Sequence, residues 1–231
     1  MSLQNLKEEY DYVISGRVYY PHFKKSREKS NAFHIVKRSM DITASLFAMI
    51  FFIPLFLLIG LGIKLEDSQG KVFFRQQRVG KDGKIFYMYK FRSMVANAEK
   101  LKQELLAQNE VSGAMFKMKN DPRVTKLGRI LRKTSMDELP QLWNVFIGEM
   151  SLVGPRPPLK SEVEEYTSYD KLRLTVTPGC TGLWQVSGRS NIGFKEMVEL
   201  DLKYIQNRSV WNDCLILVKT VRVLLGSKDA F

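Results

Sequence analysis

The sequence has few cysteines, with only Cys180 and Cys214 in 231 residues. Their spacing fits no metal-binding motif and cannot supply a disulfide framework, so we expect two free thiols in a reducing compartment. Acids are also scarce, because 24 aspartates and glutamates face 36 lysines and arginines, for a net charge of +12. Such a surplus favours anionic partners, namely nucleic acid, an anionic membrane surface or a phosphorylated substrate.

Several familiar sequence signals are missing as well. The first residues carry no apolar run of the kind that a signal peptide needs. No internal repeat or low-complexity tract is visible, and neither a dinucleotide-binding fingerprint nor a P-loop occurs. The length allows one domain with a real core, with or without appendages.

The most distinctive feature that is present is an apolar run from Ile42 to Ile63. It spans 22 residues without a charge, enough for a helix to cross the roughly 30 Å core of a bilayer. Lys37 and Arg38 precede it, as basic residues do at a cytoplasmic membrane surface. Pro54 lies within the run and predicts a kink. Because basic residues flank both ends, a tilted span and a helix that returns to the same face both fit.

A β-hairpin is predicted after the apolar run. Residues 72–79 and 84–91 flank an Asp-Gly turn signal. Lys90 and Arg92 at its end are either cations beside a site or ordinary exposed charges of a strand end. Further helices are expected over residues 96–108 and 124–132, from the acid pair to about Gly148, over 194–205, and over 210–225.

Two adjacent acids, Asp137 and Glu138, follow a basic run at the expected start of one of these helices. The partial positive charge at a helix N-terminus keeps a carboxylate ionised. An ionised Asp among cations suits attack on a phosphorylated substrate, or metal binding against one. The same acids also match a capping box with Ser135 or Thr134, in which they only satisfy backbone N–H groups. Both interpretations stay open at this level, and capping is the commoner one.

Residues 151–158 hold a single arginine, Arg156, between prolines and a glycine. The segment is too rich in proline for a helix or an inner strand. Its stiff backbone would preorganise Arg156 for a phosphate, with a plain surface turn as the alternative. A second glycine-rich segment, Thr177–Arg189, also ends in an arginine. The last predicted helix, over residues 210–225, is apolar with basic residues along it, and suits either the membrane interface or the core.

Five motifs in collinear order now make the sequence recognisable. They are Lys37-Arg38-x-x-Asp41, Lys90-Phe91-Arg92-Ser93-Met94, the segment Arg132–Leu142, Gly154-Pro155-Arg156-Pro157, and Thr177–Arg189. With these motifs the chain resembles the bacterial sugar transferases, the monotopic phosphoglycosyl transferases that begin lipid-linked glycan assembly. The resemblance covers about residues 34–226, and the five motifs in sequence are far more specific than any one of them.

The resemblance implies a reaction and a set of site residues. A sugar 1-phosphate would pass from a UDP-sugar to undecaprenyl phosphate, with release of UMP, as the first step of exopolysaccharide or capsule assembly. Asp137 would be the nucleophile that forms a covalent phospho-sugar intermediate, Glu138 would bind metal or deprotonate the acceptor, and the two acids would hold Mg²⁺. The cations expected to bind phosphate and nucleotide are Arg132, Arg156, Arg92, Lys90 and Arg189.

The resemblance also implies a fold and a location. We expect an α+β, mostly helical, membrane-seated monotopic domain with a small β-hairpin and a re-entrant helix, about residues 40–63, broken at Pro54. Both ends of this helix would lie on the cytoplasmic face of the bacterial inner membrane, with Lys37 and Arg38 at the lipid surface. Residues 1–33 would be a basic N-terminal segment, and residues 34–231 the membrane-anchored phosphoglycosyl transferase domain.

The expected partners are a UDP-sugar, undecaprenyl phosphate and membrane lipids, without nucleic acid, and self-association into a homo-oligomer stays open. The sequence lacks the multi-span N-terminal module of long family members, so it resembles a catalytic domain of the hexose-transferring type, standing alone or truncated. A different class is the alternative: a non-catalytic, membrane-anchored basic scaffold, or a protein that binds anionic lipid or nucleic acid.

Overall fold

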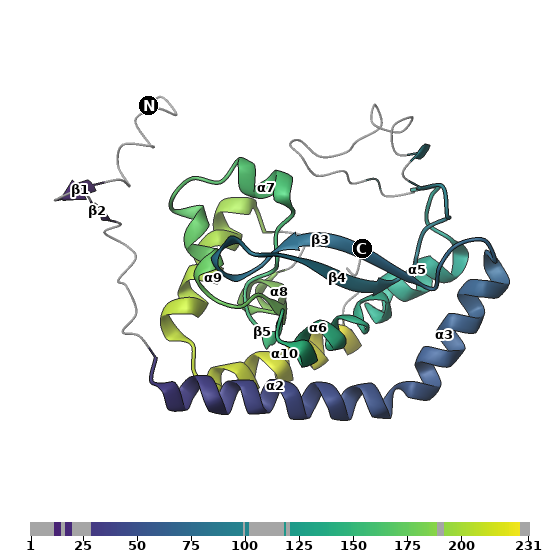
Figure 1. The fold of residues 1–231 in the computed structure, drawn as a ribbon, viewed down its shortest axis with the longest axis horizontal. Coiled ribbons are helices and arrows are strands. Elements are labelled where there is room, and N and C mark those ends of the chain that lie inside the picture. The colour runs from purple at the N-terminus through teal and green to yellow at the C-terminus, as the bar shows by residue number, and fades with distance from the viewer. Residues whose placement is uncertain are drawn as a thin grey trace.

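The computed structural model describes residues 12–14, 17–19, 29–98, 100–101, 118, 121–188 and 192–226. Two short strands, β1 (Tyr12–Ile14) and β2 (Arg17–Tyr19), pair with each other near the N-terminus. The rest is mostly helical, with one longer hairpin and one short parallel strand pair (Figure 1). This agrees with the expected mixture of helices and a small hairpin.

Two helices form a bent pair along one border of the molecule, α2 (Asn31–Phe51) and α3 (Ile53–Glu66) (Figure 1). They meet at Phe52 at an angle of 60°, with Pro54 in the first turn of α3, where its missing N–H costs no helical hydrogen bond. The predicted kink is therefore confirmed. None of the described helices could cross a membrane by itself, whereas the bent pair has the combined length and composition to do so.

The predicted hairpin is present as β3 (Phe73–Val79) and β4 (Ile85–Phe91), paired antiparallel from Phe73 opposite Phe91 to Val79 opposite Ile85. Its turn is the short 3₁₀ helix η1 (Lys81–Gly83). Asp82 and Gly83 both have positive φ, at 56° and 78°, which is what the Asp-Gly pair indicated.

The segment around the acid pair is more divided than predicted. Helix α5 (Lys126–Lys133) comes first, then the 3₁₀ turn η3 (Met136–Glu138), and then α6 (Gln141–Ile147). Ser135, in the left-handed region at φ 55°, separates α5 from η3. The acids thus lie on a separate turn before α6, and Gly148 at φ 92° ends α6 as expected.

The prediction that residues 151–158 contain no inner strand is wrong for the first three. Strand β5 (Ser151–Val153) is buried and pairs in parallel with β6 (Gly179–Thr181). The prolines begin only after this strand, so its N–H groups remain available. A Cβ on Gly179 would lie 2.0 Å from the Gly154 nitrogen. The glycines of both segments therefore allow the two backbones to touch.

Helices complete the chain. They are α7 (Lys160–Glu164), the 3₁₀ helix η4 (Asp170–Thr175), α8 (Leu183–Ser187), α9 (Phe194–Asn207) and α10 (Val210–Gly226). The last two confirm the predicted helices. The core role expected for α10 is confirmed by Ile216, which is buried in the larger apolar cluster, whereas its role at a membrane interface stays a prediction, with Trp211 73% exposed. Most of the helix expected over residues 96–108 lies outside the described residues.

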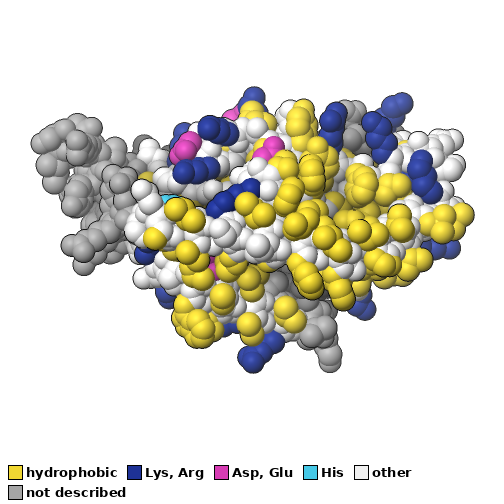
Figure 2. Space-filling model, turned by 60° about the horizontal axis from the view of Figure 1, so that its bottom comes forward, with side chains coloured by type: hydrophobic (Ala, Val, Ile, Leu, Met, Phe, Trp, Pro, Cys, Tyr) yellow, Lys and Arg dark blue, Asp and Glu magenta, His cyan; other side chains and the backbone are white. Residues whose placement is uncertain are grey.

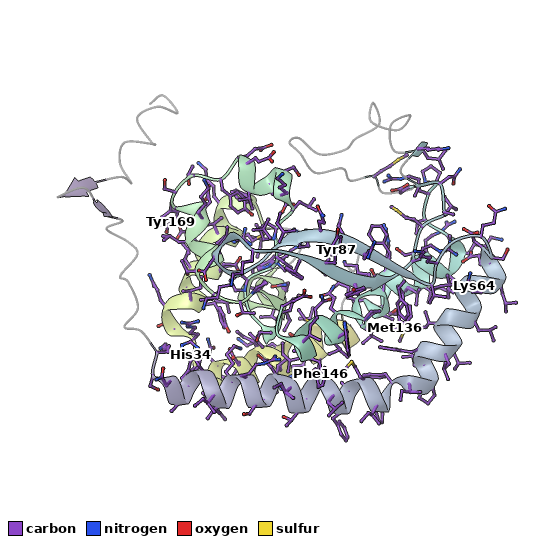
Figure 3. The ribbon with its side chains drawn as sticks, viewed as in Figure 1. His34, Lys64, Tyr87, Met136, Phe146 and Tyr169 are labelled. Atoms are coloured by element: carbon purple, nitrogen blue, oxygen red, sulfur yellow. The ribbon has the colours of Figure 1, made fainter. Side chains whose placement is uncertain are left out.

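Two apolar clusters hold these elements together. The larger one joins β4, α6, β5, α9 and α10 around residues such as Val145, Val153 and Leu202. The smaller one joins α3 to the hairpin and α5 through Ile59, Ile63, Phe91 and Leu131. Met136, one residue before the acid pair, packs against this second cluster (Figure 3). The turn that carries the acids is therefore anchored on the bent helix pair. Cys180 and Cys214 are free, as predicted.

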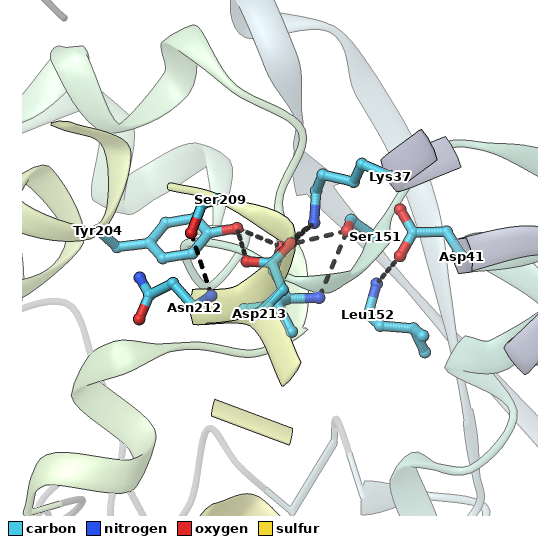
Figure 4. A network of polar contacts seen from close by, with 9 residues as sticks. Lys37, Asp41, Ser151, Leu152, Tyr204, Ser209, Asn212 and Asp213 are labelled. Atoms are coloured by element: carbon cyan, nitrogen blue, oxygen red, sulfur yellow. Dashed lines mark hydrogen bonds and ion pairs between the residues drawn. The ribbon is translucent and has the colours of Figure 1, made fainter. Parts of the chain in front are cut away.

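The N-terminal half of α2 is attached to the domain by polar contacts (Figure 4). Lys37 forms a 2.5 Å ion pair with the fully buried Asp213 and donates to the Val153 carbonyl. Arg38 donates to the last carbonyls of α6, those of Val145 and Phe146. We expected both cations at the lipid surface, and the structure instead directs them into the protein, where buried acceptors compensate for lost hydration.

The Lys37→Met variant should lose about 3–5 kcal/mol of unfolding free energy, because it leaves the Asp213 carboxylate buried without its cation. Tyr204 would remain the other hydrogen-bond partner of Asp213. Denaturant titration of the purified protein in detergent measures this loss. The exposed Lys71, changed to Met, is the matched control. If the two variants are equally stable and Lys37→Met binds membranes more weakly, the original prediction of Lys37 at the lipid surface would be supported instead.

Candidate active site

The acid pair is held by the backbone rather than by a cap. The Ser135 side chain makes no capping bond to η3, and the Thr134 hydroxyl donates to the Ile130 carbonyl of the preceding helix. The capping box that the sequence allowed is therefore not formed. What fixes Asp137 and Glu138 is the turn itself, which packs through Met136 and Leu139 on the smaller apolar cluster.

Asp137 is a buried acid, with 8% of its surface exposed. Burial raises its pKa to about 6, and the neighbouring charge of Glu138 adds to the rise. Lys90 and Arg132 act in the opposite direction. We expected the helix N-terminus to keep this carboxylate ionised, but desolvation outweighs that effect. The Asp137 carboxylate thus titrates close to neutral pH.

Glu138 has a different environment, although it is the next residue. Its carboxylate accepts a 2.5 Å hydrogen bond and ion pair from Lys90 on β4. Burial alone would raise the pKa of Glu138, but Lys90 outweighs it, assisted by Arg156 and Arg78, so the pKa lies below its usual value. Two adjacent acids whose pKa values are driven apart are typical of a site in which each has a separate chemical role.

Arg132 and Arg156 are the other predicted cations that lie near the acids. The Arg132 Nε donates to the Ser93 hydroxyl at 2.9 Å, and the Arg132 charge lowers the pKa of Asp137. Arg156 has a third of its side chain exposed and lies 3.8 Å from Glu162. Two positive charges, those of Arg132 and Arg156, beside the acid pair would attract the phosphate of a substrate.

One predicted cation, Arg92, is not brought into this group. Arg92 forms an ion pair with Asp67 at 3.1 Å and donates to the Asp67 carbonyl, at the end of α3. Arg92 therefore attaches the end of β4 to the end of α3, and its donors are used in that contact. Arg189 lies outside the described residues.

The sequence prediction missed one cation, Arg78, near the end of β3. Arg78 is 6% exposed, and its charge contributes to lowering the pKa of Glu138. A basic residue two positions before a hairpin turn is usually a solvated strand end. No pattern in the sequence indicated that residues 157–158 would cover it, because that contact joins segments almost 80 residues apart.

No group of three or more His, Cys, Asp or Glu side chains suited to a metal is found among the described residues. Magnesium is commonly held by one or two carboxylates together with substrate phosphates and water. Asp137 and Glu138 fit that pattern, because they are adjacent oxygen donors and none of the described cations forms an ion pair with Asp137.

Comparison with known proteins adds an independent line of evidence. Residues 32–227 match the family model described as bacterial sugar transferase. Over 199 residues the chain is 47% identical to the galactosyl transferase CpsE of Streptococcus agalactiae, which aligns 83% of this chain and 42% of that protein. It is 46% identical to the undecaprenyl-phosphate galactose phosphotransferase of Salmonella typhimurium, over 85% of this chain and 42% of the relative.

A shorter relative is the exopolysaccharide production protein ExoY of Rhizobium meliloti, which is 42% identical over 85% of this chain and 88% of its own length. The chain thus spans less than half of the first two relatives and most of the third. All the described acids and cations of the candidate site fall inside the matched residues. The chain belongs to the bacterial sugar transferase family.

Proposed function

We propose that the chain transfers a sugar 1-phosphate from a UDP-sugar to undecaprenyl phosphate and releases UMP, as an early step of exopolysaccharide assembly. The observation that carries this proposal is the pair Asp137 and Glu138, with opposite pKa shifts, surrounded by Lys90, Arg132 and Arg156. The names of the relatives from Salmonella typhimurium and Rhizobium meliloti support the acceptor and the pathway class.

The reaction would proceed in two displacements at the same phosphorus atom. An Asp137 oxygen attacks the sugar-proximal phosphate, and the bond to the other phosphate breaks with its electron pair leaving on UMP. The product is an acyl phosphate that joins Asp137 to the sugar 1-phosphate. An oxygen of the polyprenyl phosphate then attacks the same phosphorus, which returns Asp137 to a carboxylate and gives the lipid diphosphate sugar.

Electrostatics is the main requirement of the first displacement, because an anionic carboxylate must approach an anionic diphosphate. Lys90 and Arg132 offset that repulsion at Asp137. No described residue accepts a hydrogen bond from the Arg156 guanidinium, which can therefore donate to a phosphate oxygen. Glu138 stays ionised beside Lys90, which suits a metal ligand or a base toward the acceptor. Asp137 and Glu138 would hold Mg²⁺, which would supply further neutralisation of negative charge.

A lipid acceptor requires a site at a membrane surface. Hydrophobic side chains gather over the face seen in Figure 2, which brings the lower border of Figure 1 forward. The exposed large residues of the bent pair and α10 include Phe47, Phe51, Leu57, Leu58, Leu61, Trp211 and Val218. An exposed apolar surface of this size on helix faces indicates a membrane contact. We infer a monotopic arrangement with both ends of the bent pair on the cytoplasmic face.

The Asp137→Asn variant should lose UMP release by roughly 10⁴-fold, because the amide cannot act as nucleophile. Glu138→Gln should lose about 10²–10³-fold as a charged partner of the reaction is removed. The assay measures UMP formed from a panel of UDP-sugars with undecaprenyl phosphate and Mg²⁺. Glu164→Gln, on the exposed side of α7, is the control and should retain the wild-type rate. Full activity of Asp137→Asn would refute Asp137 as the nucleophile, whereas a wild-type chain that forms no UMP from any UDP-sugar would favour the scaffold alternative.

The rate of the wild-type enzyme should fall as the pH drops through about 6, where Asp137 becomes protonated and loses its nucleophilic form. Lys90 lowers this pKa, so Lys90→Met should move the acidic limb of the pH–rate profile to higher pH. Lys84→Met, an exposed lysine at the start of the same hairpin strand, should leave the limb unchanged. An acidic limb that does not move in Lys90→Met would contradict the assignment to Asp137.

Cysteines at Asn31 and Ser68, exposed at opposite ends of the bent pair, should react with a membrane-impermeant maleimide from the same side of the membrane. The pair bends by 60° and both ends attach to one domain, which favours a return to the starting face. The unmodified chain, with Cys180 and Cys214 partly buried, gives the background labelling. Labelling of the two positions from opposite sides would establish a true span.

A further inference from the structure

In the loop that carries Arg156, the carbonyl groups of residues 155–158 each accept a hydrogen bond. Gly179 N donates to the Pro155 carbonyl at 2.8 Å, and Val79 N donates to that of Pro158 at 2.9 Å. Arg78 Nη1 donates to the Pro157 carbonyl at 3.1 Å. Arg173 Nη2 reaches the carbonyl of Arg156 itself at 3.5 Å, the longest of the four. The backbone beneath the Arg156 side chain is therefore fixed by β3, β6 and η4.

The Arg156 backbone carbonyl accepts a hydrogen bond, but the Arg156 guanidinium makes none with the described residues. Its nearest acid is Glu162, with an Nη1 to Oε1 separation of 3.8 Å, which is too long for a hydrogen bond. The other Glu162 oxygen is occupied, because it accepts from the Leu159 N–H at 2.8 Å. Arg156 thus feels an attracting carboxylate while none of the described residues takes up its N–H donors.

Arg78 is a second cation whose charge acts on Arg156. It is buried, forms no ion pair with the described acids, and loses some of its proton affinity through burial and through the charge of Arg156. Its pKa nevertheless stays at about 10, so the group is positive at neutral pH. Arg78 Nε and Glu162 Oε1 are both buried without a hydrogen-bond partner among the described residues. A buried arginine placed close to another one is costly unless anions lie near them, and the charges of Glu162 and Glu138 offset part of that cost.

We propose that Arg78 and Glu162 are positioning residues that set Arg156 for a phosphate of the nucleotide sugar. Arg78 fixes the Pro157 carbonyl and repels the Arg156 side chain, while Glu162 attracts it without using its donors. The guanidinium is then presented with its hydrogen-bonding fork open, the form in which arginine binds phosphate through two parallel bonds. This inference rests on the proposed function and adds two residues to the donor-phosphate part of the site.

A pair of double-mutant cycles tests the proposal. Arg78→Met and Glu162→Gln are each made in the wild type and in Arg156→Ala, and kcat/KM for the UDP-sugar is measured by UMP release. In the wild type each should lower kcat/KM by about tenfold or more, mostly through KM. In the Arg156→Ala background Glu162→Gln should change kcat/KM by less than about twofold, because the residue that it positions is gone. Arg78→Met should cost clearly less there than in the wild type, with the remainder arising from its charge at Glu138.

Several outcomes separate this proposal from a purely structural role. Equal losses in both backgrounds would overturn it, since a general loss of fold acts regardless of Arg156. Arg75→Met, on the exposed part of the same strand, should change nothing. If Arg78→Met does not fold, the Glu162→Gln cycle decides alone, and Arg78→Lys should recover part of the loss if charge matters. A wild-type chain that releases no UMP from any UDP-sugar would refute the proposed function itself, whereas additive cycles in an active enzyme would refute only this inference.

Discussion

The ion pair between Lys90 and Glu138 joins the two halves of the site, because Lys90 belongs to the hairpin and Glu138 to the turn before α6. It keeps Glu138 ionised, and its ammonium also restrains the pKa of the buried Asp137. Without this cation, the buried Asp137 and the partly exposed Glu138 beside it would titrate as a coupled pair with less distinct roles. The difference between the two acids therefore depends on a contact between segments 48 residues apart.

The bent helix pair supports the elements that carry the site from both of its ends. At the N-terminal end, Lys37 and Arg38 reach β5, α10 and the end of α6. At the C-terminal end, Glu66 accepts from the first N–H groups of α5, and Asp67 pairs with Arg92 at the end of β4. The same two helices thus contact elements on both sides of the site, and a change in the angle between them would alter the geometry of the acid pair.

Local patterns predicted the elements well where short-range physics decides them. The kink at Pro54, the Asp-Gly hairpin, the stop at Gly148 and the two last helices all follow from backbone rules that operate within a few residues. Predictions of what a charged side chain touches were less successful. Lys37 and Arg38 point into the protein instead of toward lipid, and Arg92 forms an ion pair with Asp67. The acid pair lies on a 3₁₀ turn without the predicted capping box. For the three cations the partner comes from a distant part of the chain, whereas the capping box fails locally, because the Thr134 hydroxyl donates to the Ile130 carbonyl of the preceding helix.

The sequence by itself determined that Asp137 and Glu138 stand next to each other among bases, and that Arg156 sits on a stiff backbone, because these are matters of order along the chain. Tertiary structure alone decided that Asp137 is buried and Glu138 paired, which gives the two acids different pKa values. It also decided that Arg78 lies beneath the Arg156 loop. The physical reason is that desolvation and Coulomb interaction depend on distances in space, and the sequence fixes those distances only through the complete fold.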